Sequence, residues 1–270
     1  MILLLCKSSY TQTYNFEYFN VTEGLSQSKV TSIIEDKRGY LWVGTSGGGI
    51  CKFDGKNFEQ YSEKDGLSGN IVTDLNKDND GNIWATSTWG GISRFDGKSF
   101  YSFAHKEGFK KFEQLNVVFS DSKNKIWIGS KIGITTYENN KFVHLKELND
   151  AIIYEIIEDS KGNIWVGTTQ GLSRLNPTTQ KIKNFNLPIK LIEDISSNEF
   201  RKLLIINNKL WIGSSSGLFV FDLGTQEFES HPLKYNIKVN DLKLVGNKLL
   251  VATMGGLYQF DMESHTFVTD

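Results

Sequence analysis

The residues best suited to covalent chemistry or to metal binding are few in this chain of 270 residues, and their spacing favours neither use. The four histidines occur singly, whereas the ligands of structural metal sites usually stand a few residues apart. They are His105, His144, His231 and His265. We therefore predict no catalytic residues, no metal site and no cofactor.

Noncovalent binding is the chemistry that the sequence favours, and Trp89 is its main candidate residue. Trp89 lies in the polar stretch Ser87-Thr88-Trp89-Gly90, outside the regular tryptophan pattern described below. An exposed aromatic ring beside hydroxyl and amide groups is suited to stacking on a sugar. The polar residues that we assign to the same candidate site are Thr88, Ser46, Lys29, Asn70, Lys131 and Gln170. The alternative is that Trp89 packs against a neighbouring repeat and binds nothing.

Two further sets of polar residues recur along the chain. The first set consists of hydroxyl residues, each at the end of a predicted strand that contains tryptophan or, in the last copy, leucine. They are Thr45, Thr86, Ser130, Thr168, Ser214 and Thr253. A ring of hydroxyls can bind a polyol, but a feature shared by all repeats is better explained by hydroxyls that tie loops together. The second set is the aspartates Asp36, Asp78, Asp121 and Asp159. Residues 78–82 lack the distal glutamate of a calcium loop, so we interpret these aspartates as turn-forming residues.

A repeat with a period of about 40 residues positions these side chains, and that period is typical of propellers and solenoids. Its centre is the stretch Asp36-Lys37-Arg38-Gly39-Tyr40-Leu41-Trp42-Val43-Gly44-Thr45. The equivalent positions to Trp42 are Trp84, Trp127, Trp165, Trp211 and Leu250. Three residues before each of them stands glycine or asparagine, the residues that best tolerate positive φ, so each copy predicts a hairpin turn. The strand after the turn is apolar on successive residues, which indicates that both of its faces are covered.

Each repeat contains four strand-like segments joined by short connections, so we expect antiparallel meanders. Repeated four-stranded sheets with covered faces predict an all-β fold, the β-propeller, with the first segment nearest the axis and the fourth outermost. The repeats extend over about residues 26–61, 67–103, 109–145, 150–185, 187–231 and 234–270. Loops between the second and third segments share one face with the connections that lead into the first segments. The candidate site residues are therefore expected on one face. In the first two repeats the loop between the second and third segments is one residue longer than in the other four.

The N-terminal part leaves one segment over. Residues 16–19 match a fourth segment but have no first three segments before them. We expect either part of a seven-bladed propeller, whose remaining strands lie beyond Asp270, or a six-bladed ring with this strand added at its edge. Residues 1–14, with the apolar run from Ile2 to Leu5, are interpreted as the remnant of a secretion signal or as a disordered tail, and residues 15–270 as the propeller domain.

The overall composition fits this fold and excludes some partners. Aromatic residues make up 13% of the chain, and 25 glycines with only 3 prolines suit many short strands and tight turns. The formal net charge is −1, so nothing favours nucleic acid or an anionic membrane as a partner.

The first repeat resembles the two-component regulator propeller repeat. The resemblance covers Gly24-Leu25-Ser26, residues 30–45, Gly48-Gly49-Ile50 and Phe53-Asp54; it is also close in the second and fourth repeats and extends over nearly the whole chain from Phe16. In that family such repeats build the extracytoplasmic sensor part of histidine kinases, often hybrid kinases that control carbohydrate utilisation in Bacteroidetes-like bacteria. The resemblance implies a non-enzymatic, periplasmic or extracellular-face sensor with a seven-bladed propeller. It also implies an oligosaccharide or another small extracellular ligand, a downstream kinase module in the same chain or in a partner chain, and it allows a homodimer.

Two other functions stay open at this point. The stretch Gly81-Asn82-Ile83-Trp84 also resembles the repeats of streptogramin lyases, which are propeller enzymes. Such a lyase needs a histidine and an acid at the mouth of the channel, whereas the histidines here lie on or beside the fourth segments, at the rim. The other alternative is a non-catalytic scaffold that binds proteins. Titration with oligosaccharides distinguishes a sensor from a scaffold, and a lyase assay tests the enzyme.

Overall fold

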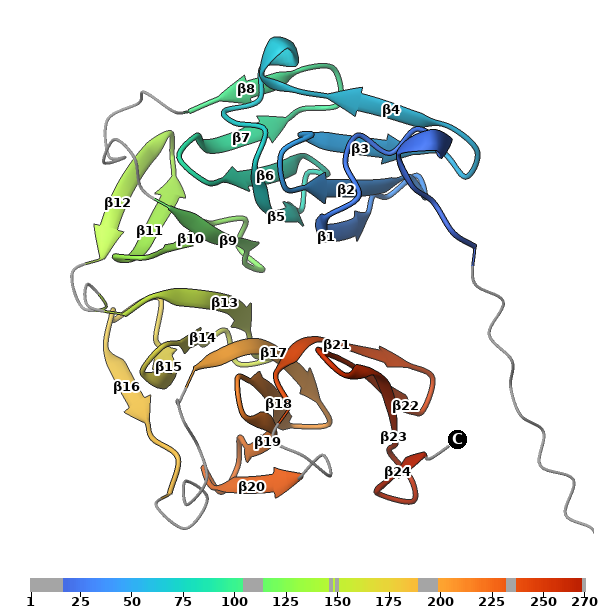
Figure 1. Cartoon of the computed structure of the whole chain (residues 1–270). Coiled ribbons are helices and arrows are strands. Elements are labelled where there is room, and N and C mark those ends of the chain that lie inside the picture. Colours follow the sequence, from blue (N-terminus) through green and yellow to red (C-terminus); the bar gives the residue numbers. More distant parts are fainter. Residues whose placement is uncertain are drawn as a thin grey trace, which may run out of the picture.

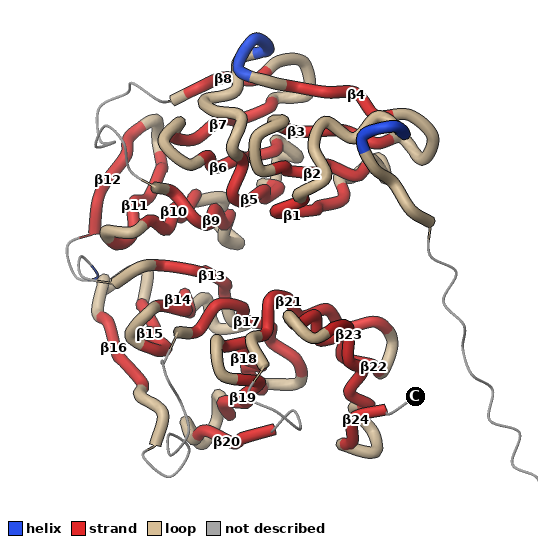
Figure 2. The backbone as a smooth tube through the Cα atoms, viewed as in Figure 1, coloured by secondary structure: helices blue, strands red, loops and turns tan. Residues whose placement is uncertain are grey.

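The computed structural model describes residues 17–103, 114–145, 148, 151–188, 199–231 and 237–268. This part of the chain forms six four-stranded antiparallel sheets, in which the strands follow one another in sequence order. Figure 2 shows that strands and short loops make up nearly all of the described backbone, with single 3₁₀ turns at η1 (Val21–Glu23) and η2 (Glu63–Asp65). The predicted all-β propeller architecture is confirmed.

Each sheet is one blade. Blade 1 consists of β1 (Val30–Glu35), β2 (Leu41–Thr45), β3 (Ile50–Phe53) and β4 (Phe58–Tyr61). Blade 2 consists of β5 (Val72–Lys77), β6 (Ile83–Ser87), β7 (Gly91–Phe95) and β8 (Phe100–Ser102). Blade 3 consists of β9 (Leu115–Ser120), β10 (Ile126–Ser130), β11 (Gly133–Glu138) and β12 (Lys141–Leu145). Blade 4 consists of β13 (Ile153–Glu158), β14 (Ile164–Thr168), β15 (Gly171–Leu175) and β16 (Ile182–Phe185). Blade 5 consists of β17 (Phe200–Ile206), β18 (Lys209–Ser214), β19 (Gly217–Asp222) and β20 (Phe228–His231). Blade 6 consists of β21 (Val239–Val245), β22 (Lys248–Thr253), β23 (Gly256–Asp261) and β24 (Thr266–Val268).

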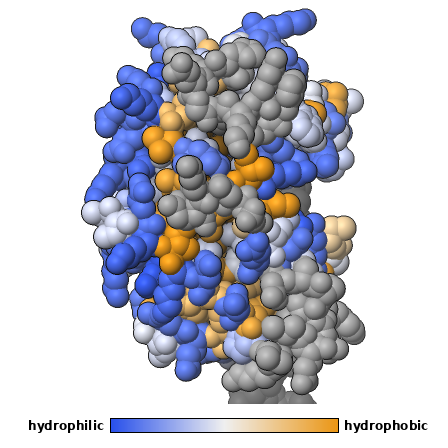
Figure 3. Space-filling view, turned by 90° about the vertical axis from the view of Figure 1, so that its left-hand side faces the viewer, coloured by the Kyte–Doolittle hydropathy of each residue, from blue (hydrophilic) through white to orange (hydrophobic). Residues whose placement is uncertain are grey.

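The blades are arranged around a central axis, with the first strand of each blade innermost and the fourth outermost (Figure 1). The first strands of consecutive blades pack side by side, from β1 against β5 through to β17 against β21. The outer strands are only half covered, as β12 and β16 illustrate. The side of the molecule where these two strands lie is accordingly hydrophilic over much of its described surface, with hydrophobic residues grouped in between (Figure 3).

The turn between the first and second strands has the predicted chemistry. In blade 1 the carboxylate of Asp36 accepts hydrogen bonds from the backbone N–H groups of Arg38 and Tyr40, and Gly39 has a φ of 84°. The equivalent residues Gly81, Asn124, Gly162 and Asn208 also have positive φ, as predicted. In blade 6 the prediction for Asn247 is wrong, because Gly246 has the positive φ instead. Glycine at the first central position of a two-residue turn is typical of a type II′ hairpin.

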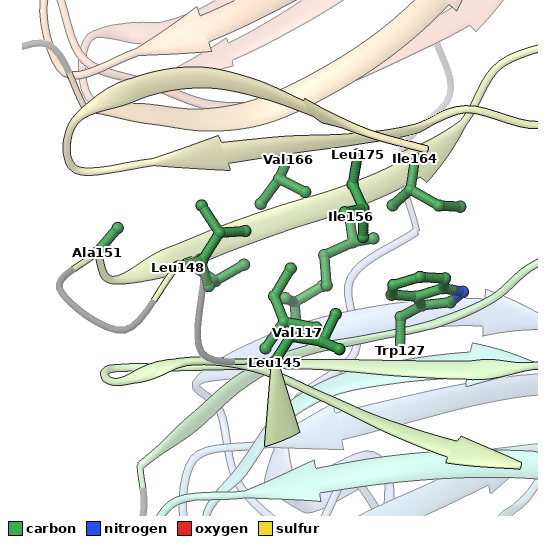
Figure 4. Packing of buried hydrophobic residues seen from close by; sticks show 11 residues of the cluster. Val117, Trp127, Leu145, Leu148, Ala151, Ile156, Ile164, Val166 and Leu175 are labelled. Atoms are coloured by element: carbon green, nitrogen blue, oxygen red, sulfur yellow. The ribbon is translucent and has the colours of Figure 1, made fainter. Parts of the chain in front are cut away.

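The tryptophan of the second strand fills the space between one blade and the next. Trp127 is almost fully buried against side chains of blade 4, among them Ile156, Ile164 and Leu175 (Figure 4). Its indole N–H donates to the carboxylate of Asp121 over 2.8 Å, so the turn aspartate also satisfies the polar atom of the core tryptophan. The same bond joins Trp42 to Asp36, Trp84 to Asp78 and Trp165 to Asp159. The second strand is thus covered on both faces, as its sequence predicts.

A small residue two positions after the tryptophan lets neighbouring blades approach closely. A Cβ atom added to Gly129 would lie 2.5 Å from the Ile153 side chain, on the first strand of the next blade. The same closeness holds for Gly44, Gly167 and Gly213. Blade 6 has Ala252 at this position, where no later blade of the described chain packs.

Blades 1 and 6 each expose a face that is buried in the other blades. On blade 1, Ile33 is 59% exposed, whereas its counterparts are at most 6% exposed. These counterparts are Leu75, Val118, Ile156, Leu203 and Leu242. On blade 6, Leu257 is 52% exposed, whereas Ile50, Ile92, Ile134, Leu172 and Leu218 are buried. The succession of blades therefore has two apolar ends.

The segment before blade 1 has the packing, though not the backbone pairing, of a fourth strand. Residues 17–20 form no strand, and Phe16 lies outside the described residues. The Phe19 ring nevertheless lies 5.0 Å from that of Phe53, centroid to centroid, just as Tyr61 packs at 5.7 Å against Phe95 of the next blade. The turn η1 then follows Phe19 as η2 follows Tyr61, each with a capping box. A seventh blade stays a prediction.

Candidate functional site

In blades 1 to 3 the loops that hold predicted site residues form a hydrogen-bonded belt that joins each blade to the next. In blade 1 the N–H of Ser46 donates to the carbonyl of Lys29 over 2.9 Å. The next residue, Gly47, donates to the carbonyl of Asn70 over 3.1 Å, which joins blade 1 to the connection leading into blade 2. The structure therefore places Lys29, Ser46 and Asn70 close together on the predicted face.

The belt continues over blades 2 and 3, whereas the bond in blade 4 lies within a single loop. Thr88 forms an isolated bridge with Gln114 of blade 3, and the N–H of Lys131 donates to the carbonyl of Gln114 over 3.2 Å. Gln170, in the equivalent loop of blade 4, donates its N–H to the Thr168 hydroxyl over 2.9 Å. Backbone atoms make these contacts, so they fix the loops and do not assign the side chains a role in binding.

Asn70 has a structural role of its own. Its side-chain oxygen accepts from the N–H of Glu63 over 2.9 Å, and the Glu63 carboxylate accepts from the N–H of Asn70 over 3.2 Å. This reciprocal pair closes the connection that contains η2. The side-chain oxygen of Asn70 is thus already bonded within the protein.

Trp89 lies in the predicted loop with 59% of its surface exposed and a φ of 64°. Positive φ is unusual for a large residue and places Trp89 in a tight turn between β6 and β7. Most of the indole surface is therefore available to solvent, as stacking on a ligand requires. Binding by Trp89 stays a prediction.

The recurring hydroxyls close their own loops. In blade 3 the Ser130 hydroxyl donates to the carbonyl of Gly133 over 3.1 Å and accepts from the N–H of Ile132. Thr45, Thr168, Ser214 and Thr253 donate to the equivalent carbonyls. In blade 2 the predicted residue, Thr86, is wrong, because the register places Ser87 opposite Gly91 at this position. These hydroxyls are loop-closing groups, and none of them lines the central cavity described next.

The first strands of all six blades line a central cavity with a volume of about 350 Å³. Each of these strands contains a β-bulge after its first residue, seen as a register shift against the second strand. A bulge redirects side chains locally, and here it turns two consecutive residues of each strand toward the axis. Because the strands begin on the loop face, this part of the cavity lies near the predicted site.

The bulges build two rings of side chains. The outer ring, nearer the loop face, consists of Thr31, Thr73, Asn116, Tyr154, Arg201 and Asn240. The inner ring consists of Ser32, Asp74, Val117, Glu155, Lys202 and Asp241. The apolar residue before each bulge is buried in blades 2 to 6. The backbone around the bulge is thus similar in these blades, whereas the side chains that line the cavity differ from blade to blade.

The inner ring contains a network of charges. The ammonium group of Lys202 lies 2.8 Å from the Glu155 carboxylate and 3.7 Å from the Asp241 carboxylate. Asp74 accepts hydrogen bonds from the Ser32 hydroxyl, over 2.9 Å, and from the N–H of Val118, over 3.1 Å.

Burial governs how these groups titrate. It raises the pKa of Asp74 above its ordinary value, and it raises the pKa of Glu155 to about 7 against the attraction of Lys202. Burial by itself would lower the pKa of Lys202, but the surrounding carboxylates outweigh it and raise the pKa above the ordinary lysine value. The lysine is thus held in its charged form, while the carboxylates have an increased tendency to bind protons.

Arg201 and Tyr154 contact each other within the outer ring. The Arg201 guanidinium lies over the Tyr154 ring, 4.4 Å from its centroid, and it pairs with the Glu199 carboxylate. Burial raises the pKa of the Tyr154 hydroxyl. The tyrosine therefore stays neutral and can both donate and accept hydrogen bonds.

The residues that line this cavity are not among the site residues predicted from the sequence, although the sequence contains a signal for them. The first segments are expected nearest the axis, and acidic residues interrupt three of them, at Asp74, Glu155 and Asp241. A charged residue within an otherwise apolar inner strand indicates a side chain that faces the channel. The period-2 pattern gives the wrong face, however, because the bulge shifts it by one residue.

The described residues show no catalytic constellation at the cavity. His144 lies on β12 with its ring nitrogen Nδ1 3.1 Å from the Thr135 hydroxyl, and His265 lies in the turn before β24. Two stretches, residues 44–48 and 213–217, match the spacing Gly-x-Ser-x-Gly, but each joins two strands of a hairpin and not a strand to a helix. Among the described residues no group of three histidine, cysteine or acidic side chains is placed to hold a metal ion, and no helix is long and apolar enough to cross a membrane.

The fold defines a β-propeller, and comparison with known families refines this class. The family model for the two-component regulator propeller matches residues 24–47 and 147–170, which belong to the first and fourth repeats. The chain therefore contains two-component regulator propeller repeats, and the resemblance expected from the sequence is confirmed. No curated protein sequence matches the chain significantly.

Solved structures with this fold have several functions. A protein described as the extracellular domain of the hybrid two component system BT3049 from B. thetaiotaomicron is 23% identical with a TM-score of 0.78, over 94% of this chain and 36% of that one. PorZ, a surface component of the type-IX secretion system of Porphyromonas gingivalis, is 16% identical with a TM-score of 0.74, over 95% and 43%. Virginiamycin B lyase from Staphylococcus aureus, in an inactive variant with quinupristin, is 14% identical with a TM-score of 0.71, over 89% and 83%.

These similarities establish the fold. The chain spans about a third of the length of the BT3049 domain. Similar folds in a sensor, a secretion component and a lyase mean that function has to be argued from the residues of this chain.

Proposed function

We propose that this chain is an extracytoplasmic, ligand-sensing propeller of a two-component signalling protein, and that its ligand is a carbohydrate. The observation that supports this most is the combination, on one face, of the exposed Trp89 with a cavity lined by hydroxyl, amide and charged groups. Sugars are bound in this way, by an aromatic platform and by several hydrogen-bonding groups placed around it.

The signalling context rests on the repeats and on the similar structures. The repeat family and the fold of the BT3049 domain support a sensor that lies outside the cytoplasm, in the periplasm or on the outer side of the inner membrane. In this proposal the propeller is not an enzyme. It transmits binding to a kinase module in the same chain or in a partner chain, with a homodimer as an assembly compatible with this arrangement.

A seven-bladed ring completes the proposal at the level of the fold. The exposed apolar faces of blades 1 and 6, represented by Ile33 and Leu257, have the character of surfaces between blades. Phe19 packs as the last aromatic residue of a preceding fourth strand. Both features support one further blade between blade 6 and blade 1.

Isothermal titration with a panel of neutral and charged oligosaccharides tests the ligand class. For a sugar that binds, Trp89→Ala should weaken affinity several-fold, since an aromatic contact contributes on the order of 1 kcal/mol beyond the area it buries. Tyr101→Ala is the matched control, because Tyr101 is an exposed aromatic residue on the outer strand β8.

Two results would contradict this proposal. Absence of binding across the whole panel, together with capture of a defined protein partner, favours a scaffold. Unchanged affinity of Trp89→Ala, with loss of binding on substitution in the aspartate turns, places the site on the opposite face.

A further inference from the structure

The central cavity has the size and the lining of a site for one small polar molecule. Its volume of about 350 Å³ lies at the low end of the range for ligand pockets, about 300–1,000 Å³, which suits one or two sugar rings better than a polymer. Every blade contributes side chains to it, and Ile33 and Val117 are the apolar members of its lining.

The cavity contains more carboxylates than cations. The ammonium group of Lys202 contacts Glu155 and Asp241, and the negative charge of Asp74 also stabilises its charged form. The charge of Arg201 is met by Glu199, which is not part of the lining. One lysine therefore serves three carboxylates.

Asp74 is the carboxylate without a direct ionic partner. Ser32 of β1 and the backbone of Val118 on β9 donate to it, Lys202 of β17 attracts it from a greater distance, and Glu155 of β13 repels it. None of the ion pairs of the described chain includes Asp74. A partly buried carboxylate whose hydrogen-bond donors are all neutral is less stable than one paired with a cation, so this position favours a positively charged group.

We propose that the cavity binds a small amino sugar, with the ammonium group of the sugar against Asp74 and its hydroxyls bonded to the neutral groups of the outer ring. The groups suited to these hydroxyls are Thr73, Asn116, Tyr154 and Asn240. The inference rests on the proposed function as a carbohydrate sensor, and it adds a second contact region, in the channel, to the one proposed at Trp89.

The charged side chains of the Lys202 network differ in exposure. The side chain of Asp241 is 60% exposed, that of Lys202 33% and that of Glu155 14%. Accessibility thus decreases from blade 6 toward blade 4, so a sugar entering beside Asp241 meets a carboxylate before it reaches the interior.

Isothermal titration with glucosamine and glucose tests this inference, because the two sugars differ in an ammonium group in place of one hydroxyl. Glucosamine should bind about tenfold more tightly than glucose, as a charge-assisted hydrogen bond is stronger than a neutral one. Asp74→Asn should remove this preference. Glu59→Gln, which removes an exposed carboxylate on β4, is the control and should keep it.

A second variant keeps the test decisive if Asp74→Asn does not fold. Asp241→Asn changes a more exposed side chain and should reduce glucosamine affinity several-fold while leaving glucose unaffected. Equal affinity for the two sugars, or a preference for glucosamine that survives in the folded variants, overturns the inference. If oligosaccharides bind in a Trp89-dependent manner while glucosamine does not, the amino-sugar site is wrong and the proposed sensor function stands.

Discussion

At the scale of single residues, the tryptophans of this chain are of two kinds, according to what surrounds the indole. Trp84 and Trp165 are at most 2% exposed and donate their N–H to a turn aspartate. Trp89 is largely exposed in a loop. The same residue type thus serves as core in one place and as candidate binding surface in another.

This difference predicts opposite effects on stability. Trp84→Ala and Trp165→Ala should each lower the free energy of unfolding by about 3–5 kcal/mol, because the loss of a buried ring leaves a cavity between blades. Trp89→Ala should change it by less than about 0.5 kcal/mol, as is usual for exposed side chains. Urea denaturation measures all three. Equal midpoints for the core variants and the parent would contradict the interblade role of the tryptophans.

The residue scale is also where sequence analysis was most successful. The turn aspartates and the glycine or asparagine after them were predictable, because few residues tolerate positive φ. The assignment of Thr86 failed, because Thr86 and Ser87 are adjacent hydroxyls and only the strand register distinguishes them. The prediction of positive φ at Asn247 failed for a similar reason, since the neighbouring Gly246 adopts the positive φ of this turn.

At the scale of elements, the β-bulge of the innermost strand determines what the channel presents. In β13 it directs Tyr154 and Glu155 to the axis, between the buried residues Ile153 and Ile156. A local irregularity therefore places a carboxylate in a site of low exposure, where its ionisation is unfavourable.

Glu155 should make stability depend on pH. Its pKa is about 7 in the folded protein and 4.5 as the ordinary value, so between these values the folded state binds more protons than the unfolded state. Stability should therefore decrease as pH rises from about 4.5 to about 7, by up to about 3 kcal/mol from this residue. In Glu155→Gln this part of the decrease should disappear, whereas the decrease that comes from Asp74, whose pKa is also raised by burial, should remain.

Urea unfolding at several pH values measures this effect, with Glu59→Gln as the control for loss of a surface charge. Asp36 and Asp159 do not interfere with this measurement. Despite partial burial, the pKa values of Asp36 and Asp159 are lowered by the indole N–H and other hydrogen bonds, so their contribution is lost only at more acidic pH. A stability profile of Glu155→Gln that is parallel to that of the parent would show that Glu155 is not buried as an acid.

At this scale the sequence predicted the four-stranded meanders and the order of the strands, but not which residues line the channel. The meander follows from short connections and alternating turns, which are local features. The rings of the channel depend on bulges that repeat at one position while their side chains differ, as Ser32, Asp74 and Lys202 do. A repeat pattern identifies the residues that recur in every copy, so it does not identify the variable residues that line the channel.

At the scale of the whole molecule, the blades are successive copies with unlike ends. Blades 2 to 5, which have a neighbouring blade on each side, bury both of their faces. Blade 1 exposes Ile33 and Val30, and blade 6 exposes Leu257. Exposed apolar surface of this kind in a soluble protein usually marks a place where another surface packs.

The last prediction compares Ile33 with Leu75, which occupies the same position one blade later. Leu75→Ser should lower the free energy of unfolding by about 3 kcal/mol or more, because it removes a buried side chain and introduces a hydroxyl between blades 1 and 2. Ile33→Ser in the same chain should change it by less than about 1 kcal/mol, since its side chain is largely exposed. Urea midpoints and sedimentation velocity on both variants check this. If Ile33→Ser is as destabilising as Leu75→Ser in a sample that sediments as a dimer, a second copy covers this face; the same loss in a monomer would mean that blade 1 is covered by residues of its own chain.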